Sequence, residues 1–329
     1  MINEYVNKLI EDLEPIYKTD KPLVIDLVLE GGVFNGGYLA GALLFIREME
    51  RKNYIRINRI SGCSVGSILA FFYLIDELEF SCELYNDIYQ KFKYQHTLDL
   101  VKDLKTLLED KIPKDKNICD IVNNRLFITY HNIEKKTKPV KCVYKDLNDI
   151  VDVIIRSSFV PLLVDGNILY KDKYIDGILP FVFVDNVVVA KKLDASNNQD
   201  INNSEDNKHD NHKILYLNIC GYDRFSHIFN AKNEPNNFHR ILTGALDIHH
   251  FYIKQQNNNM CSYIDKFNIK HRLSYNVKLL VEWFMVMYIN IIVYVKSIVP
   301  GYCYDTFAYK FLYKIATEFC IMYIDAYCV

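Results

Sequence analysis

The chain has no excess of charge of either sign. Its 39 Lys and Arg residues nearly balance its 41 Asp and Glu residues, which leaves a formal net charge of −2. A protein that binds nucleic acid usually carries a basic face, and this sequence has no basic stripe and no repeat. The charge balance therefore argues against nucleic acid as a partner.

Regularly spaced cysteines are also missing. The nine cysteines are odd in number and scattered, and no two of them form a C-x-x-C pair or have another zinc-ligand spacing. The cysteines therefore predict a reducing compartment and no zinc site. We also expect no other metal and no cofactor. Residues 1–22 mix charged and apolar side chains as an amphipathic helix does and a signal peptide does not, so we expect a cytoplasmic protein.

Nucleotide-binding motifs are absent as well. No G-x-G-x-x-G pattern occurs in the chain. Gly31 and Gly36 have the spacing of a phosphate-binding loop, but Gly37 and Tyr38 follow where Lys and then Ser or Thr are needed. These observations argue against a nucleotide site, so the glycines of this segment need another explanation.

Two of the 12 glycines flank a serine in the stretch Gly62-Cys63-Ser64-Val65-Gly66. This stretch follows an apolar run at residues 54–60 and precedes a helix-like run at residues 67–75. The glycines let the chain turn sharply from a strand into a helix, which lifts the serine hydroxyl above the sheet. The pattern predicts that Ser64 is a nucleophile and that Gly62 and Gly66 form its elbow.

A second glycine cluster, Gly31 to Gly41, follows the apolar strand expected at residues 23–29. Backbone N–H groups between a strand's carboxyl end and a helix N-terminus can bind developing negative charge. We therefore expect an oxyanion hole formed by this loop and by the residue after the nucleophile, with the members Gly31, Gly32, Val33, Gly36 and Val65.

Asp176 and Gly177 form an Asp-Gly pair that ends a short extended run. A glycine-rich loop, then a serine elbow, then an Asp-Gly pair is an order that resembles the patatin-like phospholipases over residues 23 to about 190. In that family an aspartate activates the serine and no histidine takes part. The first motif departs from the family's pattern at Val33, where a glycine is usual, and at Asn35, where a basic residue is usual.

The resemblance implies a fold, an activity and roles for these residues. The fold is a three-layer αβα sandwich of the patatin type, an α/β fold with a mostly parallel central sheet. The activity is lipid acyl hydrolysis of the phospholipase A kind on phospholipids or other fatty acyl esters, through an acyl-enzyme intermediate. Ser64 and Asp176 are the expected catalytic dyad, and Gly177 is the turn glycine.

We expect three parts in the chain. Residues 1–22 form the N-terminal amphipathic helix, residues 23–230 the catalytic domain, and residues 231–329 an aromatic-rich helical C-terminal region. Within the second part, residues 194–213 are rich in Asn, Asp, Ser and His, which predicts a flexible polar loop.

The apolar segment Leu279 to Val299 has two interpretations. Residues 283–295 contain no charged side chain, but Glu282 and Lys296 bound this stretch at less than the length of a spanning helix. The favoured interpretation is a buried helix of the C-terminal layer. The alternative is a helix that docks on a membrane, with peripheral contact to host or cellular membranes.

Two other functions stay open. The chain is compatible with an α/β-hydrolase esterase that uses a Ser-His-Asp triad, because several histidines follow the candidate acid in the required order: His227, His239, His249, His250 and His271. The departures at Val33 and Asn35 are also compatible with a protein that keeps the patatin-like fold, has lost the chemistry and serves as a lipid-binding scaffold.

Overall fold

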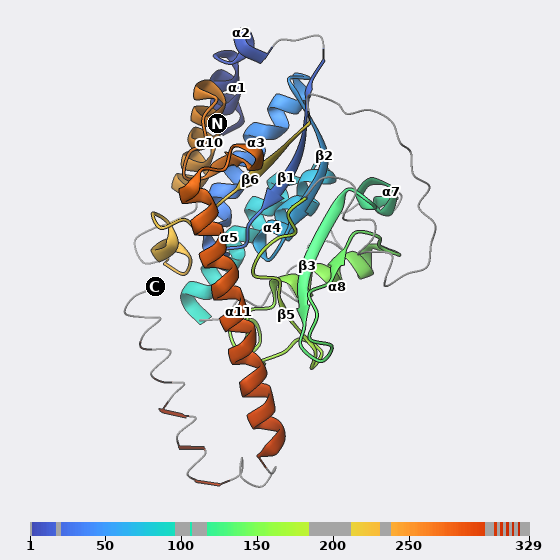
Figure 1. Ribbon diagram of the computed structural model, residues 1–329, viewed down its shortest axis with the longest axis vertical. Coiled ribbons are helices and arrows are strands. Elements are labelled where there is room, and N and C mark those ends of the chain that lie inside the picture. The colour runs from blue at the N-terminus through green and yellow to red at the C-terminus, as the bar shows by residue number, and fades with distance from the viewer. Residues whose placement is uncertain are drawn as a thin grey trace.

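A computed structural model describes residues 2–17, 21–95, 117–183, 212–230 and 238–299, together with single residues at 106 and between 306 and 322. The chain folds around a mostly parallel central sheet that is flanked by helices (Figure 1). The predicted α/β fold class is therefore confirmed. Most residues of the predicted polar loop 194–213 lie outside the described residues, and its last two residues begin a strand.

The sheet has the order β4-β3-β2-β1-β6-β7, and β5 pairs with β3 off this path. The four central strands β1, β2, β3 and β6 are parallel, whereas β4, β5 and β7 are antiparallel to their neighbours. The strands have these bounds: β1 Leu23–Leu29, β2 Ile55–Gly62, β3 Leu126–Asn132, β4 Val140–Lys141, β5 Tyr174–Asp176, β6 His212–Leu217 and β7 Cys261–Tyr263. Parallel order places the carboxyl ends of the four central strands at one edge of the sheet.

One face of the sheet is covered by a thick helical layer. In β1 the alternate residues Ile25, Leu27 and Leu29 point into this layer and are fully buried. The helix α3 packs against α1, α4, α5 and α10, and α8 packs against α4 and β3. The helices on this side have these bounds: α1 Ile2–Glu11, α2 Glu14–Tyr17, α3 Gly36–Arg51, α4 Val65–Leu74, α5 Leu78–Gln95, α7 Ile118–Val122, α8 Leu147–Ser158 and α10 Phe238–Lys254.

The other face carries a thinner cover. Val28, Phe127 and Tyr216 point to this side and pack with residues 181–183 and with Phe267 and Tyr275. Tyr275 belongs to α11, Ile269–Ile298, which crosses this side of the molecule and extends beyond the sheet (Figure 1). Three short 3-10 turns complete the described elements: η1 Val33–Asn35, η2 Phe225–His227 and η3 Ile264–Lys266.

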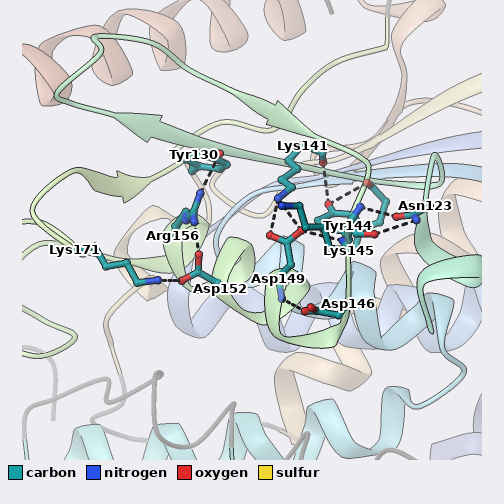
Figure 2. Close-up of polar contacts among 11 residues, drawn as sticks. Asn123, Tyr130, Lys141, Tyr144, Lys145, Asp146, Asp149, Asp152, Arg156 and Lys171 are labelled. Carbon is teal, nitrogen blue, oxygen red and sulfur yellow. Dashed lines mark hydrogen bonds and ion pairs between the residues drawn. The ribbon is translucent and has the colours of Figure 1, made fainter. Parts of the chain in front are cut away.

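Charged side chains fasten α8 to the sheet along its length (Figure 2). Asp146 caps the helix, because its carboxylate accepts a hydrogen bond from the Asp149 N–H at 2.8 Å. The Asp149 side chain accepts from Lys141 of β4 at 2.6 Å. Near the other end, Arg156 pairs with Asp152 and lies over the Tyr174 ring of β5 at 4.3 Å. These contacts fix α8 beside β4 and β5.

The prediction that Leu279 to Val299 forms a buried helix is wrong. Only Glu282 and Ile289 are buried in α11, and large apolar residues such as Trp283 and Tyr294 are more than half exposed. The helix is long and apolar enough to cross a membrane by length and composition. The absence of charge did not predict burial, because a charge-free helix is buried only where other elements cover it. The thick helical layer lies on the opposite face of the sheet and does not cover α11.

Candidate active site

Ser64 lies at the tip of a sharp turn between β2 and α4. Its backbone has φ 51° and ψ −133°, a conformation that a residue with a side chain adopts only at a cost of about 1–3 kcal/mol. The turn ends β2 at Gly62 and begins α4 at Val65 without an intervening loop. This strained geometry is what a nucleophile elbow requires.

Close backbone packing explains the two elbow glycines. A Cβ atom on Gly66 would lie 2.6 Å from the carbonyl oxygen of Glu30, and one on Gly62 would lie 2.6 Å from the carbonyl oxygen of Gly66. Side chains at these positions would push α4 away from the end of β1. The glycines therefore let the elbow and the glycine-rich loop lie side by side.

Asp176 ends β5 and lies beside the elbow. The Ile178 N–H donates a hydrogen bond to its carboxylate at 2.6 Å, and the Ser64 side chain interacts with the same carboxylate. Burial raises the pKa of Asp176 from 3.8 to about 6, although the interactions with Ser64 and Ile178 act in the opposite direction. Ser64 is 7% exposed and Asp176 is 9% exposed, so this pair is shielded from water.

Ser157, the penultimate residue of α8, connects the parts of this site. Its carbonyl oxygen accepts hydrogen bonds from the N–H of Ser64 at 3.0 Å and of Gly177 at 3.2 Å. Its hydroxyl lies 3.1 Å from the Ser64 nitrogen and donates to the Thr129 carbonyl of β3 at 2.6 Å. One residue thus fixes the spacing between the turn at Ser64 and the Asp-Gly turn.

The glycine-rich loop abuts Ser64. A Cβ atom on Gly31 would lie 2.7 Å from the Ser64 Cβ, so only glycine allows this approach. The N–H of Gly36 donates to carbonyls of Val33 and Phe34 inside the 3-10 turn, so in this arrangement it does not face an oxyanion. For the N–H groups of Gly32 and Val65, the described part of the chain supplies no hydrogen-bond partner.

The two departures from the family pattern have different structural consequences. Val33 adopts φ 44°, a left-handed conformation that is costly for a β-branched side chain. Asn35 is fully buried and donates to the carbonyls of Ile219 at 2.8 Å and Arg224 at 2.9 Å. The buried Arg240 of α10 lies 3.3 Å from the Asn35 side-chain oxygen, so a cation from another helix reaches this part of the loop.

Replacing Val33 by glycine is expected to give a more stable protein than replacing it by alanine, by about 1 kcal/mol. Both changes remove the side chain that packs on the core, but only glycine also removes the cost of the positive φ. Urea unfolding of the two variants measures the difference. At a position without backbone strain, alanine stabilises a protein more than glycine does. A Val33→Ala variant more stable than Val33→Gly would therefore show that Val33 is unstrained.

The five histidines of the triad hypothesis lie elsewhere. His227 contacts the Tyr38 hydroxyl at 3.1 Å, His249 lies near Asp12, and His271 lies 3.5 Å from the Asn258 carbonyl. His239 and His250 are exposed on α10. The Ser64 side chain interacts with Asp176 instead. The geometry therefore gives no support to a Ser-His-Asp triad.

A second group of charged residues, which the sequence patterns did not single out, surrounds the site. Glu30 is buried directly before Gly31 and accepts hydrogen bonds from Tyr216, from the Ile219 N–H at 3.1 Å and from Lys278 of α11 at 2.5 Å. His131 and Lys138 both lower the pKa of Asp176 through their charge.

These two residues are linked to α11 through Glu282. The Glu282 carboxylate pairs with His131 at 3.0 Å and with Lys138. Burial raises its pKa, but the hydrogen bonds and positive charges of His131 and Lys138 outweigh burial and hold that pKa below its ordinary value. The only sequence signal for this contact was the isolated acid beside a charge-free run. Among the described residues, no cluster of three or more His, Cys, Asp or Glu side chains is suited to hold a metal ion.

Comparison with known proteins gives one family. The family model described as patatin-like phospholipase matches residues 27–190. No curated protein matches the chain. The crystal structure of VipD from Legionella pneumophila is similar at 12% sequence identity and a TM-score of 0.36, covering 74% of this chain and 68% of that one.

Proposed function

Residues 27–190 belong to the patatin-like phospholipase family, which implies a hydrolase that acts on lipid esters, and on this premise we propose a serine mechanism. Ser64 is the nucleophile, Asp176 is the base, and the substrate is a fatty acyl ester of a phospholipid or related lipid. The observation that carries the proposal is the strained, buried Ser64, which interacts with a buried carboxyl whose pKa is raised to about 6.

The raised pKa suits Asp176 to this role. A carboxylate with a pKa near 3.8 is a weak base at neutral pH, whereas one with a pKa of about 6 accepts a proton more readily and is still mostly ionised at pH 7. Because the carboxylate lies against the serine hydroxyl, no histidine is needed to carry the proton.

In the first half-reaction, the Ser64 Oγ attacks the ester carbonyl carbon and its proton moves to Asp176. The carbonyl oxygen becomes an oxyanion, which the N–H groups of Gly32 and Val65 stabilise by hydrogen bonds. The carbon–oxygen bond to the alcohol then breaks, and the leaving oxygen takes the proton from Asp176. The products are an acyl-enzyme at Ser64 and a lysolipid or other alcohol.

In the second half-reaction, a water molecule takes the place of the alcohol. Asp176 accepts a proton from this water as its oxygen attacks the acyl carbon, and the same N–H groups stabilise the second oxyanion. When the bond to Ser64 breaks, Asp176 returns its proton to the serine oxygen. A free fatty acid leaves, and the dyad is restored.

Labelling with a fluorophosphonate probe tests this proposal, because only an activated serine reacts with it. We expect one adduct, on the peptide that contains Ser64, and loss of that adduct in the Asp176→Asn variant. Labelling of another serine would contradict the assignment. A folded protein that binds lipid but takes no label would instead favour the catalytically lapsed scaffold.

The pH dependence of hydrolysis is a further prediction. The ionised form of Asp176 is the active one, so kcat/KM should rise with pH around a midpoint of about 6 and level off above it. The Lys138→Met variant removes a charge that lowers this pKa, so its midpoint should lie at higher pH. Initial rates on a soluble short-chain ester measure both profiles. An unchanged midpoint in the variant would assign the titration to a group other than Asp176.

A further inference from the structure

The helix α11 has the reverse of the usual amphipathic pattern. The side that faces the catalytic domain is largely polar in its first half, with His271, Tyr275, Lys278 and Glu282 at successive turns. The opposite side carries an unbroken apolar stripe at helical spacing, and every member is exposed. We call this stripe the outer face: Leu273, Val277, Leu280, Phe284, Met287, Ile291, Tyr294 and Ile298.

The polar side is used to hold α11 on the catalytic domain. Lys278 donates to Glu30 at 2.5 Å and to the Asn218 side chain at 2.8 Å. Glu282 pairs with His131 and Lys138, and farther along the helix Ile289 is buried against Ile133 and Ile175. These contacts extend over much of the helix. They exclude a spanning arrangement with the domain still attached, because the bilayer would have to displace them.

The contacts also show where α11 passes over the sheet. Asn218 follows the carboxyl end of β6, Glu30 follows that of β1, and His131 lies at the end of β3. The sheet order is β3-β2-β1-β6, so the helix crosses the end of β2 between these contacts. Ser64 is the second residue after β2. The outer face therefore lies on the side of the molecule that carries the strand ends and the dyad.

The composition around the outer face decides between a lipid surface and a second helix. The spacing of the stripe would also suit a coiled coil, but the positions that flank a coiled-coil seam normally carry charges. Here the flanking residues include Val281, Trp283 and Tyr288, and residues 283–295 contain no charge. An apolar surface this broad, with aromatic residues along it, fits the interfacial region of a bilayer.

We propose that the outer face of α11 is a membrane-docking surface, on which the helix lies in the plane of the lipid–water interface while its polar side stays bound to the catalytic domain. Docking would bring the carboxyl ends of β1, β2 and β3 next to the lipid. Membrane docking rests on the proposed function, because a lipid hydrolase must reach its substrate in a membrane. Lipid binding by α11 does not, however, require an active Ser64.

A flotation assay tests docking in the full chain carrying Ser64→Ala, so that hydrolysis cannot alter the lipid. The vesicles contain equal amounts of phosphatidylcholine and phosphatidylserine. The chain should float with them. Adding Phe284→Glu and Ile291→Glu should weaken binding by at least about tenfold, because two charges would enter the apolar boundary. Both side chains are exposed, so the fold should persist, as circular dichroism can verify.

The matched control places the same two charges at exposed apolar residues away from α11, as Phe225→Glu and Val143→Glu. This control should float like the parent. Equal loss in both double variants, or equal binding in all three proteins, would overturn the proposal. A parent that fails to float and forms a dimer that the α11 charges dissociate would also overturn it, since a second copy would then cover the outer face. Because Ser64 is already absent, none of these outcomes depends on the dyad.

Discussion

Replacing Ser64 by alanine is expected to lower kcat/KM for ester hydrolysis by at least about a thousandfold, because the acyl-enzyme can no longer form. The fold should be kept or slightly stabilised, since alanine removes only the hydroxyl and leaves the backbone turn unchanged. Release of fatty acid from phospholipid vesicles and hydrolysis of a soluble ester measure the loss on two substrates.

Ser61 provides the control for this change. It lies on β2 three residues before Ser64, is fully buried, and its hydroxyl has no hydrogen-bond partner among the residues that the structure describes. Ser61→Ala should therefore leave both activity and stability close to those of the parent. If Ser64→Ala keeps most of its activity, or if the two alanine variants lose the same amount, Ser64 is not the nucleophile.

Replacing Asp176 by asparagine should have a comparable effect on activity, a loss of about a thousandfold or more. Asparagine has nearly the same shape and can still accept a hydrogen bond from Ser64, but it cannot take up the proton. Asp172→Asn is the matched control, because Asp172 is an exposed residue of the segment that leads into β5. Retained activity in the Asp176 variant would mean that another group serves as the base.

The same substitution should stabilise the fold at neutral pH. The folded-state pKa of Asp176, about 6, lies above its ordinary value of 3.8, so the stability that its protonated form contributes is lost as pH rises through about 6. Ionising this buried carboxyl costs the folded state up to about 3 kcal/mol at pH 7 and above. Asparagine has no such cost.

Urea unfolding at several pH values measures this effect. The free energy of unfolding of the Asp176→Asn variant should exceed that of the parent by an amount that grows between about pH 4 and pH 7. If the difference in the free energy of unfolding between variant and parent does not change with pH, the Asp176 carboxyl is exposed to solvent. Loss of activity combined with a gain in stability would be the expected behaviour of a functional group that is strained by its site.

Local patterns in the sequence determined the parts of the site that depend on short-range geometry. The glycines beside Ser64 are needed for a strand-to-helix turn, and the chain forms that turn with Ser64 at φ 51°. Asp176 was predicted from the order of the motifs. Its role as the base that activates Ser64 stays a proposal. The fold class followed from the resemblance that the order of the motifs indicated, and it is confirmed by the sheet.

Contacts between residues far apart in the chain depend on the tertiary structure. Ser157 joins the two turns, Arg240 reaches Asn35, and Glu282 reaches His131, although no local pattern links the members of each pair. The environment of α11 was decided in the same way. An apolar run shows only that contact between its side chains and water is unfavourable. Whether the run is buried depends on which other elements cover it. Since the helical layer covers the opposite face of the sheet, the outer face of α11 stays exposed.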